Sequence, residues 1–381
     1  MKTQYDVIVI GGGVMGAAVT AQLAQSGRSV LLLERREPAC GASGGNGGQT
    51  SLIDRCEPWH MKLALESLRY YREDLGVQYP EMEYEEAGGS IVLYNQEQIH
   101  QAQLLVQRLQ ELQVPAKLYY GQDLLQAEPA LNTDYALALL HCPWEGKLNP
   151  FGTVLSLLDV AQRHGAQLLR SATVESFEKN ERRITHVRTP AGEFQAEYVI
   201  NCAGPWSQRV AQLAGVSIPI LHHKGVFLAT SPIAPLIRGP VNDGFFLTPE
   251  SGPQPKRSFH FGVTQTAHGS ILLGQATEEC PLEDVSVNMP SLQGIAAGFL
   301  KNFPQLEELP VVRAWAAPTT YTPDGLPVFG FSSGAENFFT AAGFKGAFST
   351  APAVGRLVRD VLDGRCRQDC LPGDPDRKIS T

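Results

Sequence analysis

Two apolar runs near the start of the chain flank a segment with helical composition. Residues 7–10 (VIVI) and 29–34 (SVLLLE) are dominated by apolar side chains, which is typical of buried strands. The Ala-rich segment between them is compatible with a helix. Gly11, Gly13 and Gly16 stand at its start. The pattern predicts a strand, a glycine turn, a helix and a second strand that ends in Glu34.

Further along the chain, the apolar positions follow helical and strand periodicity in turn. Apolar residues at helical spacing predict helices over 58–76 and 96–113, and a further helix near 151–164. Residues 198–204 (YVINCAG) are typical of a buried strand that ends in a glycine turn. Residues 338–362 predict a strand, a turn and a helix whose N-terminus favours negative charge.

The stretch 216–310 differs in character from the rest. Segments such as KGVFLATSP, SFHFGVTQ and GSILLGQAT predict an antiparallel sheet with proline-rich loops. We therefore expect an α/β and α+β chain with two domains. The predicted division is a discontinuous Rossmann-like nucleotide-binding domain (1–80, 145–215 and 311–381) and a substrate domain with a mixed or antiparallel sheet (81–144 and 216–310).

The glycine turn and the acid after the second strand have the chemistry of a dinucleotide site. Gly11 permits a tight turn, Gly13 lets a pyrophosphate approach the backbone, and Gly16 lets helix and strand pack closely. Glu34, 23 residues after Gly11, is placed to accept a hydrogen bond from a ribose hydroxyl and disfavours the 2′-phosphate of NADP. The alternative is a glycine-rich turn in some other α/β unit.

Composition narrows the class of protein. With 381 residues, 43% hydrophobic and 18% charged, the chain can bury a large core. A net charge of −8 argues against a nucleic-acid partner. The sequence has no run of 18 apolar residues, so we expect no transmembrane helix. Seven scattered cysteines favour reduced thiols in the cytoplasm. Cys366 and Cys370 lack a second pair of ligands at metal spacing, so no metal site is expected.

Four separated motifs resemble one family, the D-amino acid oxidase-like flavoproteins, which includes glycine oxidase, sarcosine oxidase and the D-amino acid, opine and hydroxyproline dehydrogenases. The motifs are GGGVMGAAVTAQLAQSGRSVLLLE, GASGGNGGQTS, NCAGPWS, and TPDGLPVFG with AAGFKGAFSTAPAVGRLV. The resemblance implies non-covalent FAD at the junction of an FAD-binding domain (the nucleotide-binding domain above) and the substrate domain. It also implies a small-molecule amine or amino-acid substrate. A partner subunit or a homo-oligomer is compatible with it.

The resemblance assigns cofactor contacts to residues in each motif. The predicted contacts to FAD are made by Gly11, Gly13, Val14, Met15, Gly16, Glu34, Arg35, Ala42, Ser43, Asn46, Gly47, Gly48, Gln49, Val174, Ala203, Gly204, Trp206, Gly343, Phe344, Lys345, Gly346 and Ala347. Among them, the segment from Asn46 to Gln49 would run along the isoalloxazine, and the turn from Gly343 would face its pyrimidine edge. Lys345 would stabilise negative charge on the reduced flavin. The alternative is that Lys345 points to solvent.

The sequence departs from the family at the substrate side. Many relatives carry an arginine before the TPDG turn that binds the substrate carboxylate, and Thr319 stands at that place here. The substitutes to consider are Arg313, Tyr321, His222, His223 and Lys224. Each candidate also has a structural alternative. Arg313 is equally compatible with a structural ion pair. The two histidines are compatible with neighbouring positions on one strand, where one ring points inward and the other outward.

Three functions are compatible with these motifs. The first is oxidation of the C–N bond of a secondary amine, imino acid or D-amino acid, with hydride transfer to flavin N5. The second is an FAD-dependent 2-hydroxy acid or polyol phosphate oxidoreductase, in which His222 or His223 would serve as the base. The third is a non-catalytic FAD-binding subunit of a complex, which the missing arginine would permit.

Overall fold

The computed structural model describes residues 2–54, 57–247 and 257–377, and these form two compact units. Unit 1 comprises residues 1–45, 150–223 and 318–381, and unit 2 comprises 46–149 and 224–317. Both units are discontinuous in sequence. Residues 46–80, which we expect in the nucleotide-binding domain, belong to unit 2 in this division.

Unit 1 is built on a mainly parallel sheet, with the strand order β17-β18-β11-β1-β2-β8. Its strands are β1 (Gln4–Ile10), β2 (Val30–Leu33), β8 (Gln167–Leu169), β9 (Ser176–Asn180), β10 (Arg183–Thr189), β11 (Gly192–Asn201), β17 (Val328–Ser332) and β18 (Ala335–Ala342). Its helices are α1 (Val14–Gln25), α6 (Pro150–Arg163), α7 (Ser207–Leu213) and α9 (Ala351–Leu362). The predicted strand–turn–helix–strand start of the chain is thus confirmed.

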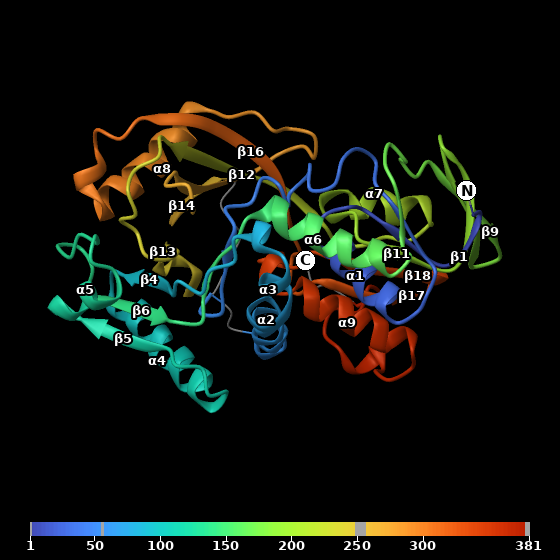
Figure 1. Ribbon diagram of the computed structural model, residues 1–381, viewed down its shortest axis with the longest axis horizontal. Coiled ribbons are helices and arrows are strands. Elements are labelled where there is room, and N and C mark those ends of the chain that lie inside the picture. Colours follow the sequence, from blue (N-terminus) through green and yellow to red (C-terminus); the bar gives the residue numbers. More distant parts are fainter. Residues whose placement is uncertain (1, 55–56, 248–256, 378–381) are drawn as a thin grey trace. The chain divides into compact units, whose positions relative to one another are not determined.

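The sheet of unit 1 is covered by helices and by a strand hairpin. Helix α1 packs against both α6 and α9, as Figure 1 shows. A buried cluster joins Ile8 and Leu31 of the sheet with Ile184 of β10 and Val210 of α7. Strands β1, β2, β8, β11 and β18 run parallel, so their carboxyl ends meet at one edge, where such sheets bind nucleotides.

Unit 2 contains a mixed sheet with the strand order β16-β12-β15-β14-β13-β4-β6-β5. These strands are β4 (Gly89–Leu93), β5 (Lys117–Tyr120), β6 (Ala138–Cys142), β12 (Leu221–Thr230), β13 (Val241–Asp243), β14 (Arg257–Gln265), β15 (Ile271–Glu279) and β16 (Val311–Tyr321). A separate ladder joins β3 (Gln49–Thr50) to β7 (Gly146–Lys147). Strands β12 and β16 also run into unit 1, because the chain division falls within them.

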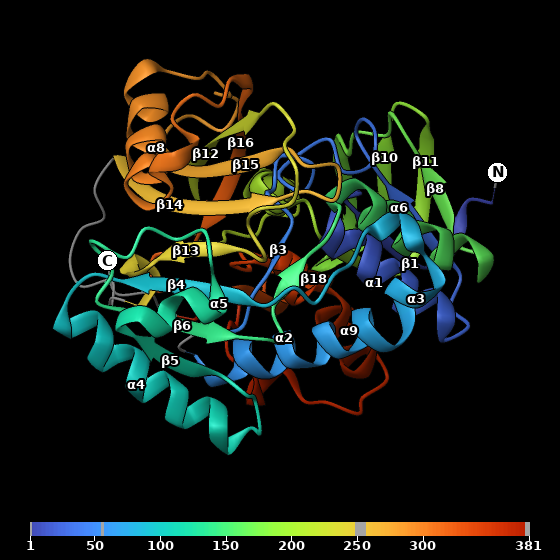
Figure 2. The same ribbon diagram turned by 60° about the vertical axis from the view of Figure 1, so that its left-hand side comes forward.

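The helices of unit 2 are α2 (Pro58–Tyr70), α3 (Gly76–Gln78), α4 (Gln96–Glu111), α5 (Leu124–Ala127) and α8 (Met289–Asn302). A π-helical turn at Tyr71–Leu75 separates α2 from α3. Helix α4 packs on β5, and α8 packs on β14 and β15 (Figure 2). The expected helices at 58–76 and 96–113 are confirmed, whereas α8 was not predicted.

Helix α2 belongs to unit 2 because its apolar face packs there. Its buried residues Met61, Ala64 and Leu68 share one cluster with Ile91 of β4 and Leu105 of α4. Burial of this apolar face stabilises the helix against unit 2, at roughly 25 cal/mol per Å² of apolar area. The periodicity of 58–76 predicts that one face of the helix is buried. It does not indicate whether that face packs against the core of unit 1 or of unit 2.

Candidate functional site

The turn after β1 admits only glycine at two positions. Gly11 has a φ of +108°, and a Cβ atom there would lie 2.5 Å from the carbonyl oxygen of Cys202. A Cβ atom on Gly16 would lie 1.9 Å from the carbonyl oxygen of Gly11. The backbone of this turn therefore packs without side chains, as the dinucleotide motif requires.

Glu34 lies buried at the end of β2, beside the glycine turn. One carboxylate oxygen accepts a hydrogen bond from the Gly12 amide at 2.7 Å, and the other accepts one from the Arg36 amide at 2.8 Å. Its side chain is 8% exposed. A carboxylate has about four acceptor positions, so these two bonds leave acceptor capacity for a ribose hydroxyl.

The glycine-rich segment that follows β2 winds against the start of α1. The amide of Ala39 donates to Gly12 at 3.0 Å, and the Ser43 hydroxyl accepts from the Val14 amide at 3.0 Å. A Cβ atom on Gly13 would lie 3.0 Å from that hydroxyl. Ser43 and the N-terminus of α1 thus adjoin each other. Together they offer hydroxyl and amide donors of the kind that bind phosphate. Met15 is buried in the first turn of α1, and Ala42 is half-buried.

Arg35 and Trp206, both predicted cofactor residues, are in contact. The Arg35 guanidinium carbon lies 3.7 Å from the centre of the Trp206 ring. The Trp206 amide donates to the Ala203 carbonyl at 3.0 Å, and Gly204 has a φ of +52°. Val174 is 9% exposed and belongs to the buried cluster beside the sheet. These residues come from different segments of unit 1.

The turn between β18 and α9 contains the remaining predicted cofactor residues of unit 1. Gly343 and Gly346 have φ values of +76° and +60°, conformations that favour glycine. Phe344 is buried, with its ring centre 6.1 Å from that of Phe329. Lys345 is exposed, and Ala347 begins a 3₁₀ turn ahead of α9. The ammonium of Lys345 is therefore accessible to a ligand or to solvent.

His223 and Tyr321, two of the substrate-side candidates, are brought together in unit 1. Their ring centres lie 4.9 Å apart with an interplanar angle of 75°. His222, the neighbour on β12, is half-buried, and Nδ1 of its ring has no hydrogen-bond partner in the described structure. Burial, and secondly the charge of Arg209, lower the pKa of His222. It is therefore a neutral base near pH 7.

Unit 2 holds the segment predicted to run along the isoalloxazine. The Asn46 side chain accepts a hydrogen bond from the Gly48 amide at 2.7 Å, and Gly48 has a φ of +73°. The Gln49 side-chain amide donates to the Thr264 hydroxyl at 2.9 Å. A Cβ atom on Gly47 would lie 3.7 Å from the ring of Phe227, which we had not predicted as a site residue.

Arg313 and Lys224, the two basic candidates of unit 2, have opposite surroundings. The Lys224 ammonium is buried and pairs with Asp284 at 2.9 Å, so it serves an internal ion pair. Arg313 is exposed, with its guanidinium carbon 5.6 Å from the centre of the Trp315 ring. The charge of Arg313 is accessible to a ligand, whereas that of Lys224 is not.

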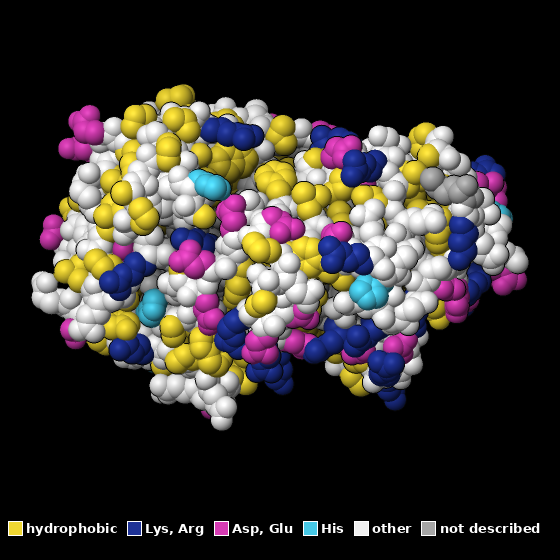
Figure 3. All heavy atoms as spheres, viewed as in Figure 1, with side chains coloured by type: hydrophobic (Ala, Val, Ile, Leu, Met, Phe, Trp, Pro, Cys, Tyr) yellow, Lys and Arg dark blue, Asp and Glu magenta, His cyan; other side chains and the backbone are white. Residues whose placement is uncertain are grey.

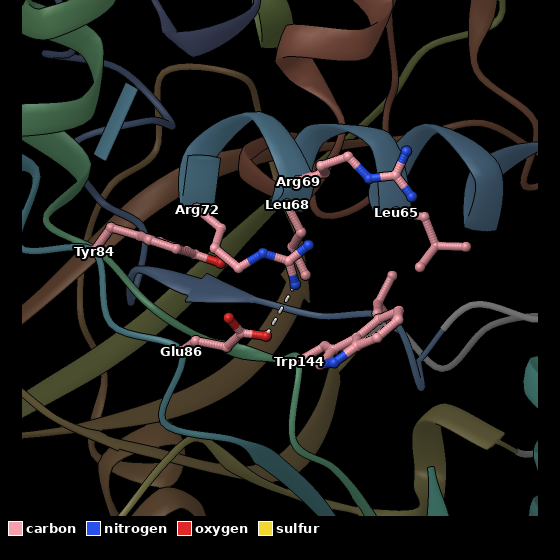
Figure 4. A pocket seen from close by; sticks show the side chains of 8 residues that line it. Leu65, Leu68, Arg69, Arg72, Tyr84, Glu86 and Trp144 are labelled. Carbon is pink, nitrogen blue, oxygen red and sulfur yellow. Dashed lines mark hydrogen bonds and ion pairs between the residues drawn. The ribbon is translucent and has the colours of Figure 1, made fainter. Parts of the chain in front are cut away.

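A small pocket of unit 2 has no predicted site residue in its lining. It is lined by Leu52, Leu65, Leu68, Arg69, Arg72, Tyr84, Glu86 and Trp144 (Figure 4). Its volume of about 20 Å³ holds little more than one water molecule. Arg72 pairs there with Glu86 at 3.4 Å, so its charge is already compensated. We assign this pocket no ligand.

Charged groups elsewhere on the described structure do not form a built site. On the face shown in Figure 3, basic and acidic side chains are interspersed. Glu178, His186 and Glu193 lie close enough together for a metal, but Arg188 hydrogen-bonds to both glutamates. The described cysteines are free thiols, and Cys56 lies outside the described residues. Within the described ranges, no helix has the length and apolar character to cross a membrane.

The residues of unit 1 fit a dinucleotide cofactor. The turn leaves no room for side chains at Gly11 and Gly16, the Ser43 hydroxyl lies at the start of α1, and Glu34 retains acceptor capacity. We expect this cradle to hold the adenosine and pyrophosphate portions of FAD. The assignments of the single residues remain predictions.

Comparison with known proteins identifies the cofactor. The chain matches the family of FAD dependent oxidoreductases (DAO) over residues 6–361. It is 26% identical to hydrogen cyanide synthase subunit HcnC of Pseudomonas aeruginosa, over 98% of this chain and 95% of that protein. It is 25% identical to the mitochondrial dimethylglycine dehydrogenase of Rattus norvegicus, of which it spans 45%.

A solved structure also matches nearly the whole chain. The L-proline dehydrogenase of P. horikoshii superposes with a TM-score of 0.89 at 25% identity, over 98% of each chain. The family match covers far more than half of the chain and includes the glycine turn, Glu34 and the turn before α9. The chain therefore belongs to the DAO family of FAD-dependent oxidoreductases.

Proposed function

We propose that this enzyme oxidises the C–N bond of a secondary amine, imino acid or D-amino acid. The observation that carries the proposal is the match over nearly the whole chain to proteins whose names specify amine substrates, proline and dimethylglycine. FAD, when bound, supplies a hydride acceptor at N5, so that the C–H bond beside the nitrogen is broken and the resulting imine is hydrolysed. We further propose that FAD is held without a covalent bond, and that the protein is cytoplasmic.

The side chains of the site have few roles in such a reaction. The substrate nitrogen must be deprotonated and its C–H bond must be directed at the flavin, so positioning supplies much of the rate. The neutral His222 is able to accept a proton. The paired rings of His223 and Tyr321 offer polar atoms, and Tyr321 stands two positions after Thr319. We propose that His223 and Tyr321 replace part of the missing arginine.

An anaerobic titration tests the proposal directly. The purified holoenzyme is titrated with D-amino acids, sarcosine, glycine, D-proline and hydroxyproline while the flavin absorbance is recorded. Bleaching by an amine is the expected result, and subsequent air would show whether oxygen is the electron acceptor. If no amine bleaches the flavin but 2-hydroxy acids or polyol phosphates do, the proposal of amine oxidation is wrong. That result would support the alternative, a 2-hydroxy acid or polyol phosphate oxidoreductase in which a histidine serves as the base.

A partner subunit is the other part of the proposal. HcnC is named as a subunit of hydrogen cyanide synthase, so a similar protein works within a complex. We propose that this chain passes electrons to a partner when oxygen does not reoxidise it. Tight FAD binding without reduction by any substrate would instead support a non-catalytic role.

Lys345 gives a prediction that concerns the flavin itself. The exposed Lys345 ammonium is expected to favour the negative charge that the flavin gains on reduction. Lys345→Met should therefore lower the flavin midpoint potential and slow reduction by substrate about 10-fold. The midpoint potential is measured against reference dyes, with Lys117→Met, an exposed lysine of β5, as the control. An unchanged potential would exclude Lys345 from the site.

A further inference from the structure

Unit 2 contains a stack of two aromatic rings, Phe227 and Trp315, with the guanidinium of Arg313 over the Trp315 ring. The rings of Phe227 on β12 and Trp315 on β16 are nearly parallel, with centres 5.7 Å apart and an interplanar angle of 14°. The Arg313 guanidinium carbon lies 5.6 Å from the centre of the Trp315 ring. Arg313 and Trp315 share one face of β16, because they are two residues apart on a strand. Both rings are half-buried, and Arg313 is exposed.

Glycines surround Phe227 and fix its position. A Cβ atom on Gly274 would lie 2.4 Å from its ring, and one on Gly225 would lie 3.2 Å away. A Cβ atom on Gly47 would lie 3.7 Å from the same ring. Gly47 belongs to the segment predicted to run along the isoalloxazine. One end of the stack therefore adjoins the segment beside which we propose that the amine is oxidised.

The Arg313 guanidinium lies over the Trp315 ring of the stack and is exposed. No carboxylate of the described residues pairs with Arg313, whereas Arg257 of the same unit pairs with Glu278 at 3.3 Å. Stacking on an aromatic ring restrains a guanidinium and leaves its N–H groups, which lie in its plane, able to bind a carboxylate. Arg313 thus has the features of an anion-binding group rather than of a structural ion pair.

We propose that Arg313 binds an acidic group at the remote end of an elongated amine substrate, whose body lies along Phe227 and Trp315. This inference rests on the function proposed above. The distance between the two ring centres and the distance from the Trp315 ring centre to the guanidinium carbon add up to about 11 Å. The guanidinium carbon of Arg313 therefore lies no more than about 11 Å from the centre of the Phe227 ring. That span is roughly the length of three residues of extended peptide. The substrate class is therefore an N-substituted amine with a carboxylate several bonds from the oxidised carbon.

A matched pair of probes tests this inference on the holoenzyme. N-(5-carboxypentyl)glycine carries a remote carboxylate, and N-hexylglycine has an uncharged chain of the same length. The apparent Kd of each probe is measured anaerobically from the perturbation of the flavin spectrum, and the limiting rate from flavin bleaching. We expect the wild-type enzyme to bind the carboxylate probe at least 10-fold more tightly.

Arg313→Gln should reduce that preference at least 10-fold, and Arg313→Lys should restore part of it because the charge remains. Arg163→Gln, which removes an exposed arginine of α6, is the control that should keep the preference. A wild-type enzyme without the preference, or an Arg313→Gln variant that keeps it, would overturn the inference. Reduction by both probes with no such preference would leave the proposed function standing. Arg313-dependent binding without any bleaching would instead contradict amine oxidation while supporting the anion site.

Discussion

Replacing Glu34 by alanine is expected to weaken FAD binding about 10- to 100-fold. The buried carboxylate accepts hydrogen bonds from the amides of Gly12 and Arg36 and keeps acceptor capacity for the ribose. A hydrogen bond to a charged group contributes about 1.5–3 kcal/mol, and each buried N–H group left without a partner costs about 1–3 kcal/mol. The variant should therefore lose both cofactor affinity and stability of unit 1.

The measurement is the Kd for FAD, obtained by adding FAD to the apoprotein, together with the apparent melting temperature of the apoprotein. Glu37→Ala serves as a control, because Glu37 lies three residues away and is 65% exposed in its pair with Arg170. Glu34→Gln keeps the volume but places a donor against one of the two amides, so it should also weaken binding. FAD retention equal to the wild type in Glu34→Ala would show that the ribose contact is made elsewhere.

The parts of the fold predicted from the sequence are those that local pattern determines. The apolar run of β1, the glycine turn and α1 follow one another in the order that the residues dictate. Helix α4 follows from the spacing of Ile99, Leu105 and Leu109, all of which are buried. In these segments, propensity, periodicity and turn chemistry agree with the fold, so that sequence reasoning succeeds.

Helix α8 shows where local reasoning fails. It contains Gly294 and Gly298 in its interior, and interior glycines lower helix propensity, whereas Pro290 stands in the first turn, where proline is tolerated. Tertiary packing compensates, because a Cβ atom on Gly294 would lie 2.5 Å from the Phe259 ring. The glycine lets the strand and the helix approach closely. A single sequence does not show such a contact between residues 35 positions apart.

In the candidate site, as in the fold, the features that depend on local sequence were predictable and those that depend on distant contacts were not. The predicted cofactor residues of unit 1 lie within short motifs, so their types and spacing point to dinucleotide chemistry. The substrate-side charges depend on distant neighbours. Lys224 is buried against Asp284, 60 positions away, whereas Arg313 is exposed and lies over the Trp315 ring. The stack of Phe227 on Trp315 joins residues 88 positions apart, and its only sequence signal was a glycine two positions before an aromatic residue in KGVFLAT.

Replacing Gly16 by alanine is expected to disrupt the cofactor turn, although alanine is the better helix former. Helix propensity favours alanine by about 1 kcal/mol in a helix interior. The added Cβ atom would lie 1.9 Å from the Gly11 carbonyl oxygen, and this neighbour is backbone that moves only with β1. Overpacking typically costs about 1–3 kcal/mol, and more where the backbone must shift. The steric cost therefore exceeds the gain in propensity.

Gly298→Ala is the matched control, since Gly298 is also a glycine in a helix. Its added Cβ atom would lie 3.4 Å from Cβ of Phe261, close to ordinary van der Waals contact, so this variant should be neutral or about 0.5–1 kcal/mol more stable. Thermal unfolding followed by FAD fluorescence distinguishes the two. Gly16→Ala should release FAD at a temperature roughly 5 °C lower or more, or fail to retain it on purification. If both variants retained FAD to the wild-type temperature, α1 would have room to move away from β1, and the close approach at Gly16 would not be what holds the phosphate-binding turn in place.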